Sequence, residues 1–235
     1  MSNKLKSIIL DFDGTIGDTR RLIVRTMQQT IAELGLESRT DDECAAMIGL
    51  PLKQTFTDLI PMDDATGDLC AATYRRIFDV NNTPDAVPMF PGVGETIRKM
   101  HSAGLLVTIA SSRFRTSLAD FVDRMGLSEY IPYMLGAGDV EHAKPAPDMV
   151  LKTLADNGLC PENAIVVGDT VYDIRMAHAA GVPAVGVTYG NGHRADLEKE
   201  RAEWIIDDFR ELEGILEVQS FKVVREVIAR SPIAE

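Results

Sequence analysis

The chain has 235 residues, of which 45% are hydrophobic and 26% are charged, as in ordinary globular proteins. This length allows one large domain, or a core with a smaller accessory module. The formal net charge of −12 argues against nucleic acid or an anionic membrane as a partner, because both need faces rich in Lys and Arg. An anionic ligand would therefore need a bound cation and a few well-placed basic residues.

The cysteines and the N-terminal segment indicate the cellular compartment. The three cysteines are widely spaced and form no C-x-x-C pair, which is typical of a reducing compartment and disfavours a structural zinc site. The apolar run at residues 8–10 is too short for a signal peptide, and no run approaches the length of a membrane span. We therefore expect a cytoplasmic protein. We also predict a monomer or a weak dimer.

The first third of the chain combines one strand with a series of helices. The apolar run at residues 7–10, which ends in a turn, predicts a buried strand of a parallel sheet. Apolar residues then recur at helical spacing, and a capping box at residues 40–43 marks the start of one helix. The predicted helices cover residues 19–34 and run from residue 41 towards residue 49. Helical patterns continue after Pro51 and appear again through residues 74–78. Strand patterns are absent from this part of the sequence, so we predict an all-helical module.

After a proline-rich connector at residues 84–91, helical and strand patterns alternate. The predicted helices cover residues 93–103, 116–125, 147–157 and 172–180. The predicted strands cover residues 105–110, 164–167, 184–187 and 204–206, with a further apolar run at 133–135. Repeated βα units predict an α/β fold, in which a Rossmann-like parallel sheet carries helices on both faces.

The opening strand at residues 7–10 is expected to join this sheet, which makes the helical module an insertion. We predict a core formed by residues 1–16 and 86–235, and an inserted all-helical domain formed by residues 17–85. The tail at residues 218–235 is expected to be a helix packed on the core or a frayed end, and we assign it no function.

Polar residues follow the predicted strands. Asp11 follows the first strand, Ser111 and Ser112 follow the second, and Asp169 follows the strand at residues 164–167. Lys144 lies in a loop after the apolar run at 133–135. Open α/β sheets bind ligands at the carboxyl ends of their strands. We therefore expect carboxylates, hydroxyls and one ammonium group to meet at one edge of the sheet.

Such a cluster has a recognisable chemistry. Asp11, Asp13, Asp169 and Asp173 would raise one another's pKa unless a cation neutralised them. Ligation by oxygen alone suits Mg²⁺, which also shares substrate phosphates. Lys144 and the serine loop can hold the remaining phosphate oxygens. Aspartate is a known nucleophile for phosphoryl groups, and such a reaction also needs an acid to protonate the departing alkoxide.

Four stretches of the chain match a known pattern in the same order. They resemble the four motifs of the haloacid dehalogenase superfamily: Asp11-Phe12-Asp13-Gly14-Thr15, the strand that ends at Ser111, Lys144-Pro145, and Gly168-Asp169-Thr170-Val171-Tyr172-Asp173. The resemblance spans essentially the whole chain, and the inserted helices resemble the small helical cap of this superfamily. Further stretches resemble phosphoglycolate-phosphatase-like members: Phe90-Pro91-Gly92-Val93, Lys144-Pro145-Ala146-Pro147 and Thr188-Tyr189-Gly190.

The resemblance implies a role for each motif residue. Asp11 would be the nucleophile and a Mg²⁺ ligand, while Asp13 would be the general acid and base, with its backbone carbonyl as a second ligand. Asp169 would bind Mg²⁺ directly, and Asp173 would hold a metal-bound water or Lys144.

The phosphate would be bound by Ser111, by the backbone of Ser112 and by Lys144, which would also contact the nucleophile. The implied activity is that of a Mg²⁺-dependent phosphatase, which hydrolyses a small phosphorylated metabolite through an aspartyl-phosphate.

Other activities share parts of this pattern. A haloacid dehalogenase would use the same nucleophile but would need neither Mg²⁺ nor Asp13. A phosphomutase of the β-phosphoglucomutase type shares the motifs and the cap location, and a pyrophosphatase is a further alternative. A non-enzymatic phospho-acceptor module also uses an acidic pocket with Mg²⁺ and Lys, but needs no proton-donating Asp13. Asp173 can also be read simply as an acidic residue that stabilises a helix N-terminus.

Substrate contacts are expected from the cap. The segment at residues 49–53 lies between two predicted helices, where a cap loop would approach the core. Lys53 is therefore a candidate contact for a carboxylate or second phosphate of the substrate. Arg113 and Arg115, which follow the serine pair, are alternative anion contacts.

Overall fold

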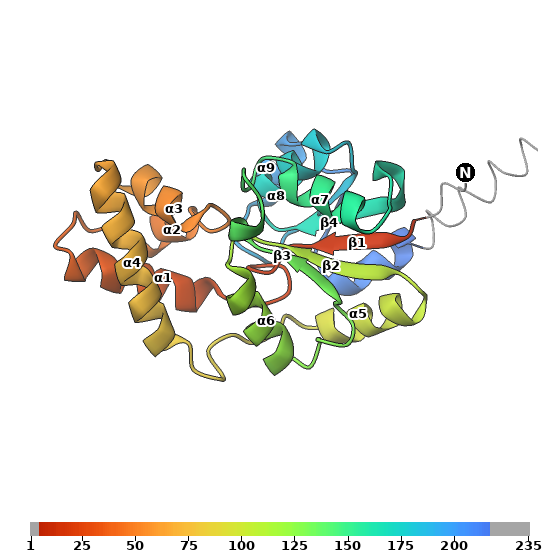
Figure 1. Ribbon diagram of the computed structural model, residues 1–235, viewed down its shortest axis with the longest axis horizontal. Coiled ribbons are helices and arrows are strands. Elements are labelled where there is room, and N and C mark those ends of the chain that lie inside the picture. Colours follow the sequence, from red (N-terminus) through yellow and green to blue (C-terminus); the bar gives the residue numbers. More distant parts are fainter. Residues whose placement is uncertain (1–4, 217–235) are drawn as a thin grey trace, which may run out of the picture.

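The computed structural model describes residues 5–216, and its centre is a six-stranded parallel sheet with the order β3-β2-β1-β4-β5-β6 (Figure 1). Every predicted strand is present, and the predicted α/β fold is confirmed. The strands are β1 (Ser7–Leu10), β2 (Leu106–Ala110), β3 (Tyr133–Leu135), β4 (Ala164–Gly168), β5 (Ala184–Val187) and β6 (Trp204–Ile206). The tail at residues 218–235, for which we predicted a packed helix or a frayed end, lies outside the described residues.

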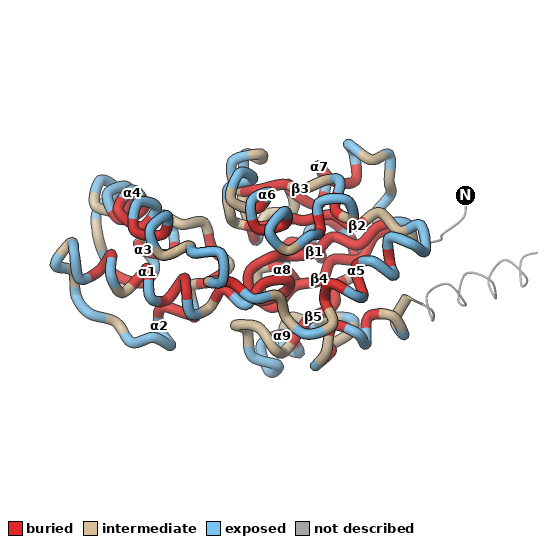
Figure 2. The backbone as a smooth tube through the Cα atoms, turned by 90° about the horizontal axis from the view of Figure 1, so that it is seen from below, coloured by how far each residue is buried: buried red, intermediate tan, exposed pale blue. Residues whose placement is uncertain are grey.

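Both faces of the sheet are covered by helices, because the strand side chains alternate between two apolar clusters. Ile8 and Leu10 of β1 belong to the cluster that includes side chains of α5 and α6, whereas Ile9 belongs to the one that includes α7 and α8. The central strands β1, β4 and β5 are accordingly buried along their whole length, whereas the edge strands β3 and β6 are only partly buried (Figure 2). The helices of this part are α5 (Val93–Ser102), α6 (Arg115–Arg124), α7 (Asp148–Asp156), α8 (Val171–Ala179) and α9 (Arg194–Lys199).

The helices that precede α5 pack on one another beside the sheet (Figure 1). They are α1 (Arg20–Glu33), α2 (Asp41–Ala45), α3 (Leu52–Leu59) and α4 (Asp64–Asn81). The predicted capping box is present at α2, where the backbone N–H of Thr40 donates to Glu43 at 2.7 Å and the N–H of Glu43 donates to Thr40 Oγ1 at 3.2 Å. The helix ends at Ala45, earlier than predicted, because the N–H groups of Met47 and Ile48 bond three residues back and form tight turns.

Two neighbouring chain segments connect these helices to the sheet. The N–H of Asp18 donates to the carbonyl of Pro88 at 2.8 Å, and the N–H of Phe90 donates to the carbonyl of Ile16 at 3.0 Å. The connections therefore lie side by side, although the predicted domain boundaries at residues 17 and 85 stay a prediction. We refer below to α1–α4 as the cap helices.

The shortest helical elements were not predicted from the sequence. Helix α9 has six residues and three 3₁₀ turns have three residues each, which is too short for a periodic pattern. Helix α7 starts at Asp148, and Pro147 is its N-cap rather than its first residue. No helix within residues 5–216 combines the length and the apolar character that a membrane span requires.

The fold depends on close packing at the central strand β1. Ile9 is fully buried, so Ile9→Ala should leave a cavity and lower the free energy of unfolding by about 2–5 kcal/mol, measured by urea denaturation. Val80→Ala on α4, where the side chain is 76% exposed, should change stability by no more than about 0.5 kcal/mol. Equal effects of the two substitutions would contradict this account of the core.

Candidate active site

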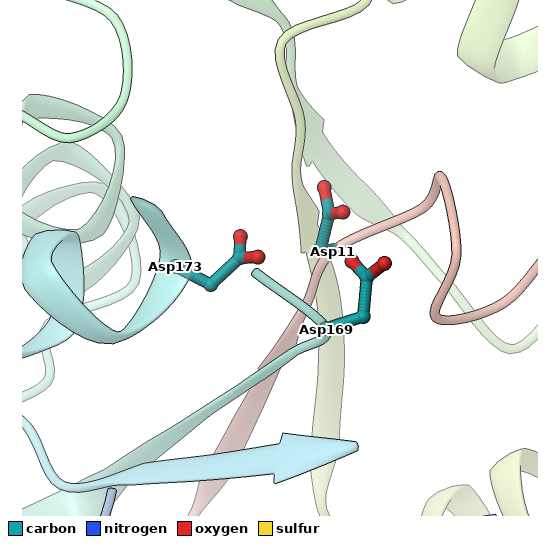
Figure 3. A group of neighbouring side chains, drawn as sticks. All are labelled: Asp11, Asp169 and Asp173. Atoms are coloured by element: carbon teal, nitrogen blue, oxygen red, sulfur yellow. The ribbon is translucent and has the colours of Figure 1, made fainter. Parts of the chain in front are cut away.

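Three acidic side chains meet at the carboxyl-terminal edge of the sheet (Figure 3). Asp11 follows β1, Asp169 follows the neighbouring strand β4, and Asp173 lies in the first turn of α8. All three are buried, and one oxygen from each carboxylate lies within 4.8 Å of the others. The predicted convergence of strand-end residues is thus present in the structure.

The cluster is electrostatically unfavourable without a further positive charge. Burial is the main cause that raises the pKa of Asp11, to about 7, while Lys144 acts in the opposite direction. Burial, together with the charges of Asp11 and Asp173, raises the pKa of Asp169 well above its usual value. Within residues 5–216, Asp169 Oδ1 is buried and has no hydrogen-bond partner. An unpartnered buried carboxylate oxygen is costly, and it is a suitable ligand for a cation.

Lys144 supplies one positive charge to the cluster. Its Nζ lies 2.6 Å from Asp11 Oδ1 and 2.5 Å from Asp173 Oδ1. Burial disfavours the charge of Lys144, but the two carboxylates outweigh this effect and raise its pKa. The other oxygen of Asp173 accepts hydrogen bonds from the N–H and the hydroxyl of Thr170, so Asp173 both caps α8 and holds Lys144. The alternative interpretation of Asp173, as a residue that only stabilises the N-terminus of a helix, therefore accounts for only part of its contacts.

Three buried carboxylates and one ammonium leave a formal excess of two negative charges at this edge. Together with the free oxygen of Asp169, this donor set fits one divalent cation that prefers oxygen ligands. The predicted ligands were Asp11, Asp169 and the backbone carbonyl of Asp13. The geometry brings Asp173 close to the first two, while the contribution of Asp13 stays a prediction.

Asp13 is not one of the three clustered carboxylates and pairs with Arg113. The guanidinium Nε lies 2.8 Å from both carboxylate oxygens of Asp13, and one terminal nitrogen lies 2.7 Å from Oδ1. The side chains are only 11% and 12% exposed, and the guanidinium lies 5.0 Å from the ring centres of both Phe78 and Phe121. Arg113, which we predicted as an anion contact for the substrate, is therefore occupied by an aspartate of the chain itself.

The remaining predicted residues have different surroundings. Ser111 is buried, and its Oγ accepts the N–H of Arg113 at 3.3 Å. Ser112 donates its hydroxyl hydrogen to the carbonyl of Gly49 at 2.6 Å, which joins the loop after β2 to the cap helices. Lys53 pairs with Asp64 at 2.6 Å and with Asp68 at 3.0 Å, both on α4.

Asn191 also belongs to this site, although the sequence did not predict it. Its backbone N–H and its side-chain amide donate to Asp169 Oδ2 at 2.6 and 3.0 Å, which fixes the orientation of that carboxylate. Its position after β5, another strand end, was the available signal. The close approach of the loop after β1 to Asp169 also depends on Gly14. Its φ is +82°, and a Cβ at this position would lie 2.0 Å from Asp169 Oδ2.

The sequence profile of the family described as haloacid dehalogenase-like hydrolase matches residues 8–187. The chain belongs to this family. This hydrolase is similar over 210 residues to "Probable phosphatase IndB" of Dickeya dadantii, at 31% identity, with 88% of this chain and 91% of the relative covered. The superfamily resemblance of the four motifs is thus confirmed.

More distant relatives have names with different substrates. The hydrolase is 26% identical to "Pyrophosphatase PpaX" of Oceanobacillus iheyensis, with 88% of this chain and 95% of the relative covered. It is 23% identical to "Phosphoglycolate phosphatase" of Salmonella typhimurium, with coverage of 88% and 91%. Its fold is shared by a solved haloacid dehalogenase-like family hydrolase from Streptococcus pneumoniae, with a TM-score of 0.81, 22% identity, and coverage of 92% of this chain and 99% of the other.

The acidic cluster predicts that Mg²⁺ stabilises this hydrolase. A large excess of Mg²⁺ over its dissociation constant should raise the melting temperature at pH 8 by about 5 °C or more, measured by thermal unfolding. The increase should be smaller at pH 5, because the pKa of Asp11 is about 7 and protons then compete with the ion.

Asp169→Asn should remove most of the increase at pH 8, whereas Asp85→Asn, at an exposed position outside the site, should retain it. A full Mg²⁺-dependent increase in Asp169→Asn would contradict the assignment of the cation to this cluster.

The Asp13–Arg113 pair is buried among aromatic rings, so loss of one partner should be costly. Arg113→Met should lower the free energy of unfolding by about 3–5 kcal/mol, because the carboxylate of Asp13 is left without its counter-charge. The double variant Arg113→Met/Asp13→Asn should lose less than the sum of the single variants, measured by urea denaturation. Arg175→Met, which breaks an ion pair with Glu200 on the surface, should cost less than about 1 kcal/mol. Additive effects at positions 13 and 113 would show that the pair is not coupled.

Proposed function

We propose that the chain is a Mg²⁺-dependent phosphatase that hydrolyses a small phosphorylated metabolite through an aspartyl-phosphate on Asp11. The observation that carries the proposal is the position of Asp11 at the end of β1. There it is held by Lys144 at 2.6 Å and lies beside Asp169, one buried oxygen of which has no hydrogen-bond partner within residues 5–216. Relatives along nearly the whole chain that are named as phosphatases also support it.

In the first half of the reaction, an oxygen of Asp11 attacks the phosphorus atom. The bond between this oxygen and phosphorus forms, the ester bond breaks, and Asp13 donates a proton to the departing alkoxide. In the structure Asp13 is paired with Arg113, so it must exchange this partner for the leaving oxygen and carry a proton at that moment.

In the second half, water attacks the aspartyl-phosphate. Asp13 accepts a proton from the water, the new bond to phosphorus forms, and the bond to Asp11 breaks, which releases inorganic phosphate and restores the enzyme. Lys144 stays beside Asp11 and can contact phosphate oxygens, and Ser111 and the backbone of Ser112 would bind the others.

Mg²⁺ would be held by Asp11, Asp169 and the backbone carbonyl of Asp13, and it would supply charge neutralisation between the carboxylates and the phosphate. Asn191 would act through Asp169, since its two hydrogen bonds orient that carboxylate. Hydrolysis of pyrophosphate is the second candidate activity, because several relatives carry the name "Pyrophosphatase PpaX".

The proposal predicts phosphate release that depends on Mg²⁺ and on both aspartates of the β1 loop. A screen of phosphorylated sugars, nucleotides, phosphoglycolate and pyrophosphate should find turnover that a chelator abolishes. Asp11→Asn should lower kcat by at least ~10³-fold because the nucleophile is lost, and Asp13→Asn should lower it by ~10²–10⁴-fold.

Asp85→Asn serves as the matched control and should retain full activity. Turnover that a chelator does not affect would contradict the role of Mg²⁺. Full hydrolysis by Asp13→Asn would favour a phospho-acceptor module over the proposed mechanism.

A further inference from the structure

A cavity of about 650 Å³ lies between the cap helices and the loop that follows β2. Asp13, Ser112 and Arg113 form part of its wall. The cavity therefore borders the proposed phosphate site at Ser112, and Asp13, the proposed general acid, lines it. Its volume is within the range of roughly 300–1,000 Å³ that is typical of pockets for drug-sized ligands, which is far more than a two-carbon group needs.

The cap side of the cavity is mainly apolar. Among the side chains that line it are Met27, Met47, Leu50, Leu52, Tyr74 and Phe78. Phe114 lines the opposite wall, at the start of α6, and is 47% exposed although it is a large apolar side chain. Met47 and Leu52 on the cap side and Phe114 on the opposite wall keep exposed apolar surface, and covering this surface with an apolar ligand is favourable.

The basic side chains of the cavity offer little to an anion. Lys53 is neutralised by Asp64 and Asp68, and Arg113 is neutralised by Asp13. These contacts take up the cations that we predicted as contacts for a carboxylate or a second phosphate.

Arg75 is the exception on this wall, because it forms no ion pair within residues 5–216. Its guanidinium lies 5.0 Å from the ring centre of Phe114, and Asp79, one turn further along α4, also lines the cavity without an ion pair in the same part of the chain. The lone positive charge is therefore opposed by a lone negative one.

We propose that this cavity holds the leaving group of the substrate and selects an apolar or aromatic group of at least the size of a benzyl ring. The proposal rests on the proposed phosphatase function, and it disfavours glycolate and a second phosphate as leaving groups.

The test compares esters whose leaving groups have similar chemistry but different apolar size. With Mg²⁺, kcat/KM for benzyl phosphate should exceed that for ethyl phosphate and for phosphoglycolate by at least ~10-fold, because burial of apolar atoms in a pocket has this scale of effect. Phe114→Ala and Met47→Ala should each lower the ratio of benzyl to ethyl phosphate several-fold. Leu151→Ala on α7, at a similarly exposed position of 46%, should leave both rates unchanged.

Preference for phosphoglycolate or pyrophosphate, with loss of that preference in Arg75→Met or Lys53→Met, would overturn the inference while leaving the proposed phosphatase function intact. An equal kcat/KM for benzyl and ethyl phosphate would overturn it as well.

A binding measurement separates this inference from the proposed function. Benzylphosphonate has no ester bond, and by calorimetry it should bind at least ~10-fold more tightly than ethylphosphonate, with Phe114→Ala reducing the difference. If no phosphoester is hydrolysed, the proposed function fails, and this comparison still decides the nature of the cavity. Equal binding of the two phosphonates would overturn the inference.

Discussion

Lys144 is 2% exposed and forms two ion pairs at the edge of the sheet, one with Asp11 and one with Asp173. These contacts join the end of β1, the loop before α7 and the first turn of α8, which are far apart in the sequence. A buried ion pair of this kind adds little net stability, but loss of one partner leaves an uncompensated charge and costs about 3–5 kcal/mol. The three elements are thereby held in one arrangement, with Asp11 at its centre.

This arrangement leaves an excess of negative charge at the edge of the sheet. One ammonium cannot neutralise three buried carboxylates, and Asp169 keeps one oxygen without a partner in the described part of the chain. The same imbalance that disfavours the cluster alone makes it suitable for a divalent cation. Asn191 orients this carboxylate, because it donates two hydrogen bonds to the other oxygen of Asp169 and so fixes the direction of the unpartnered one.

The second buried pair, Asp13 with Arg113, has a different consequence. It places the proposed general acid on the wall of the cavity rather than among the other carboxylates. The acidic edge of the core would perform the chemistry, while the cap helices provide most of the apolar surface that a leaving group would meet. The hydrogen bond from Ser112 to Gly49 joins these two parts directly beside the site.

The sequence by itself determined the order in which strands and helices follow one another along the chain. It also determined the strand ends on which Asp11, Ser111 and Asp169 lie. Such patterns are local: a buried parallel strand is a short continuous apolar run, and apolar residues in a helix repeat about every 3.6 residues, whatever the rest of the chain does. The family resemblance added the roles of these residues.

Only the tertiary structure decided which charges are paired. Arg113 and Lys53 both appeared free to bind an anion, but the fold places Asp13 beside Arg113 and the first turns of α4 beside Lys53. Asn191 had no recognised role until β5 was seen next to β4. The physical reason is that a long polar side chain can reach several partners, and packing of segments distant in sequence selects among them.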